Sequence, residues 1–157
     1  MRTRVTILLW TIFTTSTLVG CEKIKRKSDD LSDKVVAKFD PINPDTRFNK
    51  KRFAEFFGFT PAEDVTNLYC YSELGADASY YFSFKCNETT LKKIKEGLKL
   101  TNDSTSIGLT GFDLNYAWWD KDKIEAIKPL TRQDGSLYWY LWYDRKNGHV
   151  YFLTFDT

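Results

Sequence analysis

A cluster of aromatic and acidic residues in the second half of the chain has side chains that could bind a ligand. Trp118 and Trp119 are adjacent, with Tyr116 before them and Asp120 after them. Tryptophan and tyrosine are enriched in binding hot spots because each combines a large apolar ring with a hydrogen-bonding group. The pattern predicts a contact surface for a protein partner or for sugar rings. In the alternative, one tryptophan caps the hydrophobic core and the other half covers it.

Carboxylates near the tryptophans are the candidates for chemistry. Asp113, Asp120 and Asp122 could form the carboxylate pair of a glycoside hydrolase or bind calcium, but EF-hand spacing is absent and solvated aspartates explain them equally. The single histidine, His149, follows a predicted hairpin turn, and no G-x-S-x-G, H-E-x-x-H, C-x-x-C or glycine-rich phosphate motif occurs. We therefore expect a non-catalytic protein without metal or cofactor, with an aspartate-dependent hydrolase as the weaker alternative.

The first 21 residues predict where the protein is located. Arg2 and Arg4 precede an apolar run over residues 5–13, as in secretory signal peptides, and the run is shorter than the roughly 20 residues that span a bilayer. The segment ends in Leu18-Val19-Gly20-Cys21, which resembles the lipobox of bacterial lipoproteins. That resemblance implies cleavage before Cys21 and lipidation of Cys21. The alternatives are an ordinary signal peptide with a chance cysteine and an uncleaved transmembrane helix.

These features divide the chain into a signal peptide (1–20), a lipid anchor and tether (21–46) and a single domain (47–157). Removal of the signal takes two arginines and no acid from 23 basic and 21 acidic residues, so basic and acidic residues then balance. A neutral domain is a poor nucleic-acid binder, because that affinity comes mainly from clustered basic residues. We expect the membrane, through lipidated Cys21, and a protein or polysaccharide as partners, and no nucleic acid.

Cys70 and Cys86 form an even pair, and an exported protein can form disulfides. If their strands make a hairpin that turns near Gly75, Cys70 lies opposite Phe82 and Cys86 about four residues further on. That offset of roughly 13 Å is too long for a disulfide unless the loop is longer or bulged. A disulfide and two separate buried thiols both remain open.

Hydrophobic periodicity predicts an α+β domain with a mainly antiparallel sheet of about four strands and helices on one face. An amphipathic helix over 48–57 ends at Gly58, and a second begins after Asn87 and covers the sheet. In the strand 79–86, we expect Phe82 and Phe84 on the core face. The other predicted elements are a strand over 67–73, a long loop over 101–111, a helical turn within 121–128, and a hairpin of 137–143 with 149–155.

Aromatic residues occupy both sides of the terminal hairpin, so each face of the sheet is either covered or a binding surface. The organisation is also similar to small bacterial lipoproteins of unassigned function. Together these observations predict a lipid-anchored cell-envelope protein, at the outer membrane, its periplasmic side or the surface, that binds a macromolecule, with 101–120 as the contact. An inhibitor or immunity-type role is one form of this, and an envelope carbohydrate- or peptidoglycan-binding module is the alternative.

Overall fold

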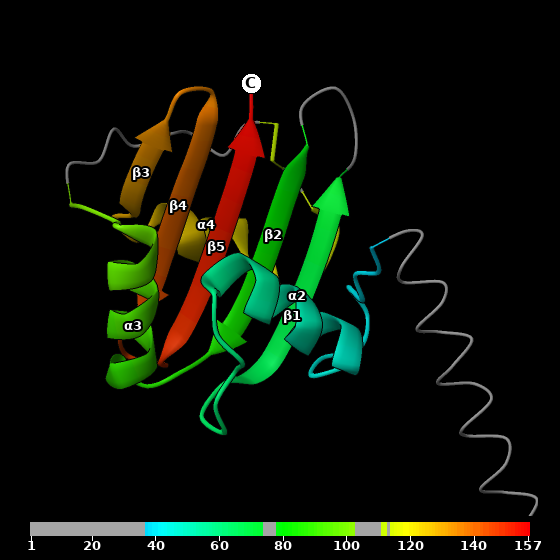
Figure 1. Cartoon of the computed structure of the whole chain (residues 1–157). Helices are drawn as coiled ribbons and strands as arrows, with labels where there is room; N and C mark the ends of the chain where they lie inside the picture. The colour runs from blue at the N-terminus through cyan, green and yellow to red at the C-terminus, as the bar shows by residue number, and fades with distance from the viewer. Residues whose placement is uncertain (1–36, 74–77, 103–110, 113) are drawn as a thin grey trace, which may run out of the picture. The chain divides into compact units, whose positions relative to one another are not determined.

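A five-stranded antiparallel sheet forms the centre of the folded unit, which comprises residues 39–157 (Figure 1). The computed structural model describes residues 37–73, 78–102, 111–112 and 114–157. The strand order is β1-β2-β5-β4-β3, so the C-terminal strand lies in the middle of the sheet. The strands are β1 Thr66–Glu73, β2 Ser79–Lys85, β3 Leu130–Asp134, β4 Leu137–Asp144 and β5 His149–Asp156. The predicted α+β class is confirmed, and the described sheet has one strand more than expected, β3.

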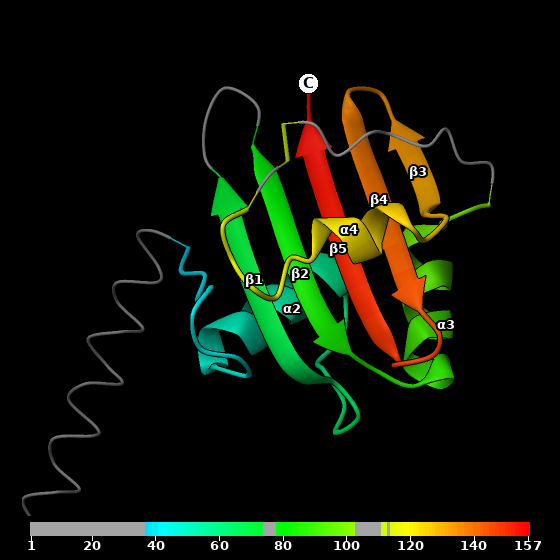
Figure 2. The same ribbon diagram turned by 180° about the vertical axis from the view of Figure 1, so that it is seen from behind.

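Helices cover both faces of the sheet. Helices α2 (Arg47–Phe57) and α3 (Glu88–Leu98) lie on one face, and the short helix α4 (Lys121–Glu125) lies on the other, as the two opposite views show (Figures 1 and 2). The expectation of helices on one face is therefore correct for α2 and α3 and wrong for α4. The reason is that Ile124 of α4 packs among the aromatic residues of the opposite face.

The predicted caps Gly58 and Asn87 mark the end of α2 and the start of α3. The Thr46 hydroxyl accepts a hydrogen bond from the Asn49 N–H at 3.2 Å, and Gly58 ends α2 in the left-handed conformation with φ 77°. The Asn87 side chain caps α3 by accepting from the Thr90 N–H at 2.9 Å. These local interactions fix the ends of both helices that pack on the first face.

The face under α2 and α3 has an aliphatic and phenylalanine core. Phe82 and Phe84 of β2 are fully buried there, which confirms the predicted core face of that strand. Phe53 and Phe57 of α2 pack their rings against Phe84 at centroid distances of 5.2 and 5.7 Å. Ile94 of α3 completes the cluster, whose other buried members include Val65, Leu68, Leu91, Leu100, Leu141, Val150 and Phe152.

The opposite face has a second core, rich in tyrosine and tryptophan. Phe112, residues 114–120 and α4 cover it. Trp119 is the centre of this cluster, and Tyr81, Trp142 and Tyr151 surround its ring in edge-to-face contacts. The remaining buried members are Ile124, Tyr140, Leu153 and Phe155. Both faces of the terminal hairpin are thus covered.

The two domain cysteines are separate buried thiols. Cys70 pairs with Phe82 across the β1–β2 ladder, as predicted, so Cys86, directly after β2, lies four positions further along the chain. The disulfide that the sequence left open is absent, because this offset keeps the thiols apart. Burial raises the pKa of both thiols to about 12, so both are protonated at neutral pH.

The folded unit begins before α2, with a segment that the sequence interpretation assigned to the tether. The Asn49 side chain, fully buried in α2, donates to the carbonyl oxygens of Asp40, Asn43 and Leu68 at 2.9 to 3.1 Å. Phe39 packs on Tyr80 of β2 with a centroid distance of 5.8 Å. These contacts hold residues 39–46 against β1 and β2. Cys21 and the predicted signal peptide lie outside the described residues.

Candidate functional site

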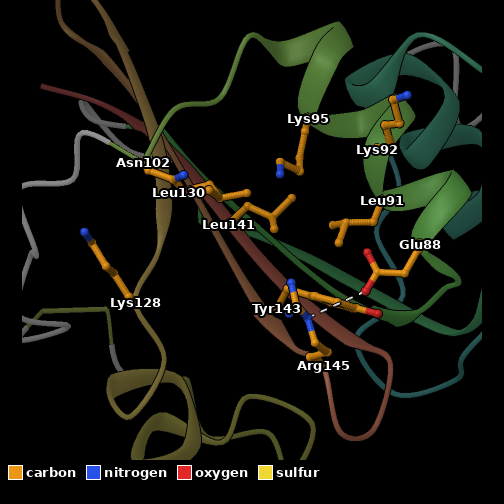
Figure 3. A pocket seen from close by; sticks show the side chains of 10 residues that line it. All are labelled: Glu88, Leu91, Lys92, Lys95, Asn102, Lys128, Leu130, Leu141, Tyr143 and Arg145. Atoms are coloured by element: carbon orange, nitrogen blue, oxygen red, sulfur yellow. Dashed lines mark ion pairs between the residues drawn. The ribbon is translucent and has the colours of Figure 1, made fainter.

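A groove between α3 and the β3–β4 edge of the sheet is the candidate binding site (Figure 3). Its volume is about 350 Å³, within the lower range of ligand-binding pockets. Residues from α3, the chain before β3, β3, β4 and the β4–β5 turn line it. They are Glu88, Leu91, Lys92, Lys95, Asn102, Lys128, Leu130, Leu141, Tyr143 and Arg145.

The floor of the groove is apolar. Leu130 of β3 and Leu141 of β4 are direct partners in the strand ladder, and Leu91 of α3 faces them. The chain after α3 is fixed beside β3 because Thr101 and Thr131 exchange two backbone hydrogen bonds of 2.9 Å. The floor is therefore formed by β3, β4 and α3, and the hydrogen bonds of Thr101 hold the end of α3 beside β3.

The rim of the groove is cationic, with four basic side chains and one carboxylate. Two of the basic groups have weak ion pairs: Arg145 lies 3.8 Å from Glu88, and Lys92 lies 3.8 Å from Glu96. All four of these groups are exposed, so each pair contributes little stability. The groove keeps its excess of positive charge.

Lys95 is the basic residue best placed to contact a ligand. It is half-buried, and Figure 3 shows its ammonium group turned toward Leu130 and Leu141, whereas that of Lys92 points away from the groove. Among the described residues, no carboxylate lies within 4 Å of the ammonium group of Lys95 or of Lys128. An anion in the groove would therefore meet unpaired positive charge above an apolar surface.

Tyr143 adds a polar group to this surface. Burial, followed by the negative charge of Glu88, raises the pKa of its hydroxyl, so the hydroxyl stays protonated and can donate a hydrogen bond at neutral pH. The groove thus combines cations, a hydroxyl donor and an apolar floor. This combination suits a ligand with both acidic and apolar groups, and no pair of groups in it resembles a nucleophile with its base.

The tryptophans that the sequence marked as contact residues are part of the fold on the opposite face. Trp119 is 4% exposed, and its indole N–H donates to the Phe112 carbonyl at 3.2 Å. Trp118 is half-buried, stacks in parallel with Tyr69 and Tyr116 at 5.6 and 5.5 Å, and donates to the Pro41 carbonyl at 2.7 Å. This is the arrangement of the alternative interpretation, with one tryptophan in the core and the other half covering it.

The described aspartates that the sequence marked as candidate catalytic or calcium-binding residues either have hydrogen-bonding partners or are exposed to solvent. Asp120 caps α4 by accepting from the Lys123 N–H, and its carboxylate lies 2.6 Å from the Lys123 ammonium group. These hydrogen bonds lower the pKa of Asp120. Asp122 is exposed on α4, and Asp113 lies outside the described residues. Asp120 and Asp144 line the same hollow, and the carboxylate of each already accepts hydrogen bonds from its own turn of the chain.

A second, polar hollow of about 370 Å³ lies beside Trp118 on this opposite face. His149 lines it, and the Nε2 atom of His149 lies 2.7 Å from the Ser83 Oγ. A serine next to a histidine can be a nucleophile, but Ser83 is fully buried and its hydroxyl also lies 3.3 Å from the Trp118 carbonyl oxygen. The pair therefore holds strands and loop together rather than presenting a nucleophile to solvent.

The sequence analysis missed the groove. The only signal was the alternation of lysine with apolar residues along α3, where Lys92 and Lys95 follow Leu91 and Ile94. Such a pattern is typical of any amphipathic helix with a solvated face. The contribution of Lys128 and Arg145 could not be predicted, because the strand order brings them to α3 from distant positions.

Comparison of the chain with protein-family models, curated proteins and solved structures found no match. Within the described part of the chain, no group of histidine, cysteine and carboxylate side chains could hold a metal ion. No helix there is long and apolar enough to cross a membrane. The functional conclusion therefore depends on the groove and on the N-terminal motif.

Proposed function

We propose that this protein is a lipid-anchored component of the bacterial cell envelope that binds an acidic segment of another protein in the groove beside α3. The observation that supports the proposal is the unpaired Lys95 ammonium group above the floor of Leu91, Leu130 and Leu141. An acidic peptide with leucine-like side chains complements both features. An inhibitor or immunity-type role is one form of the proposal.

Binding and anchoring have separate tests. For binding, a fluorescent peptide of alternating leucine and glutamate is titrated with the full-length protein, alongside a peptide that has lysine in place of glutamate. We expect Lys95→Glu to weaken binding of the acidic peptide by about tenfold or more, because it replaces attraction with repulsion. Lys50→Glu is the matched control, since Lys50 is an exposed lysine on α2 outside the groove.

Two outcomes distinguish the alternatives. Equal binding by the Lys95→Glu and Lys50→Glu variants would contradict the groove as the site. Retention on peptidoglycan or polysaccharide, lost on Trp118 substitution, would favour the carbohydrate-binding alternative. The structure gives that alternative less support, because the Trp118 ring is already stacked on two tyrosines.

The anchor proposal depends on the lipobox and is tested with Cys21→Ser. A lipidated cysteine holds a protein on the membrane through acyl chains, at roughly 0.8 kcal/mol for each buried CH₂ group. We expect the serine variant to leave the membrane fraction or to keep its signal peptide. A variant that is processed and still fractionates with membranes would contradict lipidation at Cys21.

A further inference from the structure

The hollow around His149 has the features of a second binding site, on the face opposite the groove. Strands β2 and β4 contribute Lys85 and Asp144, the β4–β5 turn contributes Asn147, and β5 contributes His149 and Tyr151. The covering segment with α4 contributes Ala117, Trp118, Asp120 and Lys123. Its volume of about 370 Å³ is enough for a small molecule. Three strands and two connecting segments thus converge on one polar hollow.

Most charged groups in the hollow already have partners. Asp120 pairs with Lys123 at 2.6 Å. The Asp144 carboxylate accepts hydrogen bonds from the Asn147 side chain and from the backbone N–H groups of Lys146 and Asn147. Lys85 is exposed, and no carboxylate of the described residues lies within 4 Å of its ammonium group. Two lysines and two aspartates thus balance while His149 is neutral, and protonation of His149 gives the hollow one net positive charge.

The imidazole of His149 has one nitrogen available. Its Nε2 atom is 2.7 Å from the Ser83 Oγ, and the described hydrogen bonds leave Nδ1 without a partner. If His149 is protonated, Nε2–H donates to Ser83 and the Ser83 hydroxyl donates to the Trp118 carbonyl 3.3 Å away. The Nδ1–H group, on a residue that lines the hollow, then has no acceptor among the described hydrogen bonds. In this series of hydrogen bonds, each donor hydrogen then has an acceptor except the one on Nδ1.

We infer that this hollow binds a small monocarboxylate, whose oxygens accept hydrogen bonds from His149 Nδ1–H and the Lys85 ammonium group. The carboxylates of Asp120 and Asp144 face the same space, so a doubly charged anion such as phosphate meets more repulsion than a monocarboxylate does. The rings of Trp118 and Tyr151 provide apolar surface for a short carbon chain. This inference is independent of the groove, since no residue lines both hollows.

Carboxylate binding should couple to protonation of His149. In the free protein, burial lowers the pKa of His149, and the positive charges of Lys85 and Lys123 lower it further. The negative charge of Asp144 raises it in part. A bound carboxylate adds a negative charge beside the ring and raises this pKa. Affinity should therefore increase as the pH falls toward the pKa of the free protein, until the ligand itself is protonated.

The chain has a single histidine, so its imidazole NMR signals belong to His149 without ambiguity. The test titrates sodium acetate into the full-length protein in detergent micelles, with sodium chloride added to keep the ionic strength constant. We expect a saturable shift of the imidazole signals and a higher His149 pKa in saturating acetate. Lys85→Ala should weaken the acetate affinity by about tenfold, as loss of a charged hydrogen bond does, whereas the surface control Lys50→Ala should not change it.

Three results would overturn the inference. A shift that rises linearly with acetate would show an unspecific effect, and an unchanged affinity in Lys85→Ala would remove the proposed cation. Tighter binding of inorganic phosphate than of acetate would show that the site does not select monocarboxylates. His149→Gln, in which the amide can still donate to Ser83, should bind acetate weakly while its melting temperature shows that it is folded.

Discussion

The two faces of the sheet are covered by different kinds of structure, and their core residues differ accordingly. The face under α2 and α3 is packed with phenylalanine, leucine, isoleucine, valine and two thiols. On the opposite face, five of the eight buried core residues are tyrosine or tryptophan, namely Tyr81, Trp119, Tyr140, Trp142 and Tyr151. Helices cover the first face, whereas the second is covered by Phe112, the irregular segment 114–120 and the short helix α4.

The difference follows from where backbone hydrogen bonds go. A helix satisfies most of its own N–H and C=O groups, so a purely apolar core can pack against it. An irregular segment leaves carbonyl groups that need donors. On the second face, the Trp119 indole N–H serves Phe112 and the Ser83 hydroxyl lies near the Trp118 carbonyl, while Trp118 itself donates to Pro41. The tryptophan pair that resembles a binding motif is thus explained as part of a covering segment.

Phe84→Ala tests the helix-covered face and should have the largest effect. Phe84 is fully buried and packs against Phe53 and Phe57. We expect a loss of roughly 3 to 5 kcal/mol in the free energy of unfolding, as for other buried aromatic residues, measured by urea denaturation. That is a large part of the stability of a domain of this size. Phe84→Leu, which keeps most of the volume, should cost much less, and equal losses would contradict a packing origin.

Trp119→Phe tests the second face and should cost about 2 to 3 kcal/mol. The substitution keeps an aromatic ring among Tyr81, Trp142 and Tyr151 but removes the donor to the Phe112 carbonyl and leaves a small cavity. Trp142→Phe is the control, because it removes a similar ring and no hydrogen bond from the Trp142 indole is described. The free energies of unfolding of the two variants are compared by chemical denaturation. A smaller loss in Trp119→Phe than in Trp142→Phe would contradict the role of the indole donor.

Trp118→Phe should cost about 1 kcal/mol. Trp118 is half-buried, so its ring contributes less than that of Trp119, but the variant loses the hydrogen bond to Pro41 that holds the segment before α2. We expect faster hydrogen exchange of the backbone N–H groups in residues 39–46, with little change in those of α3. Binding of an acidic peptide in the groove should be unchanged, because the groove lies on the other face. Loss of that binding without loss of stability would restore the contact role predicted from the sequence.

The same difference between the faces explains what the sequence could predict. Phe82 and Phe84 alternate on β2, and Asn87 and Gly58 are recognisable caps, so the helix-covered face follows from local pattern. The segment that covers the second face has no hydrophobic periodicity, so the sequence did not decide whether Trp119 is buried. The strand β3 was missed because it is short, polar at its end and preceded by Pro129. The groove could not be predicted without the strand order, because Lys95 and Lys128 line one groove only when β3 and β4 lie beside α3.

Stability between pH 7 and 5 should depend weakly on His149, the smallest effect that distinguishes the two faces. Burial and the positive charge of Lys85 lower the pKa of His149 in the folded state. As the pH falls below the unfolded-state value of about 6.5, the unfolded chain takes up a proton before the folded chain does, so stability decreases until the folded-state pKa is reached.

Chemical denaturation across this pH range, with wild type and His149→Gln compared at each pH, isolates the contribution of the single histidine. Wild type should lose more stability than the variant on acidification, and saturating acetate should reduce that loss if a carboxylate raises the folded-state pKa. Cys70 and Cys86, which belong to the helix-covered face, have pKa values of about 12 and remain protonated throughout. The pH dependence should therefore come from the loop-covered face, and an identical pH profile in His149→Gln would show that His149 is as solvated in the folded protein as in the unfolded chain.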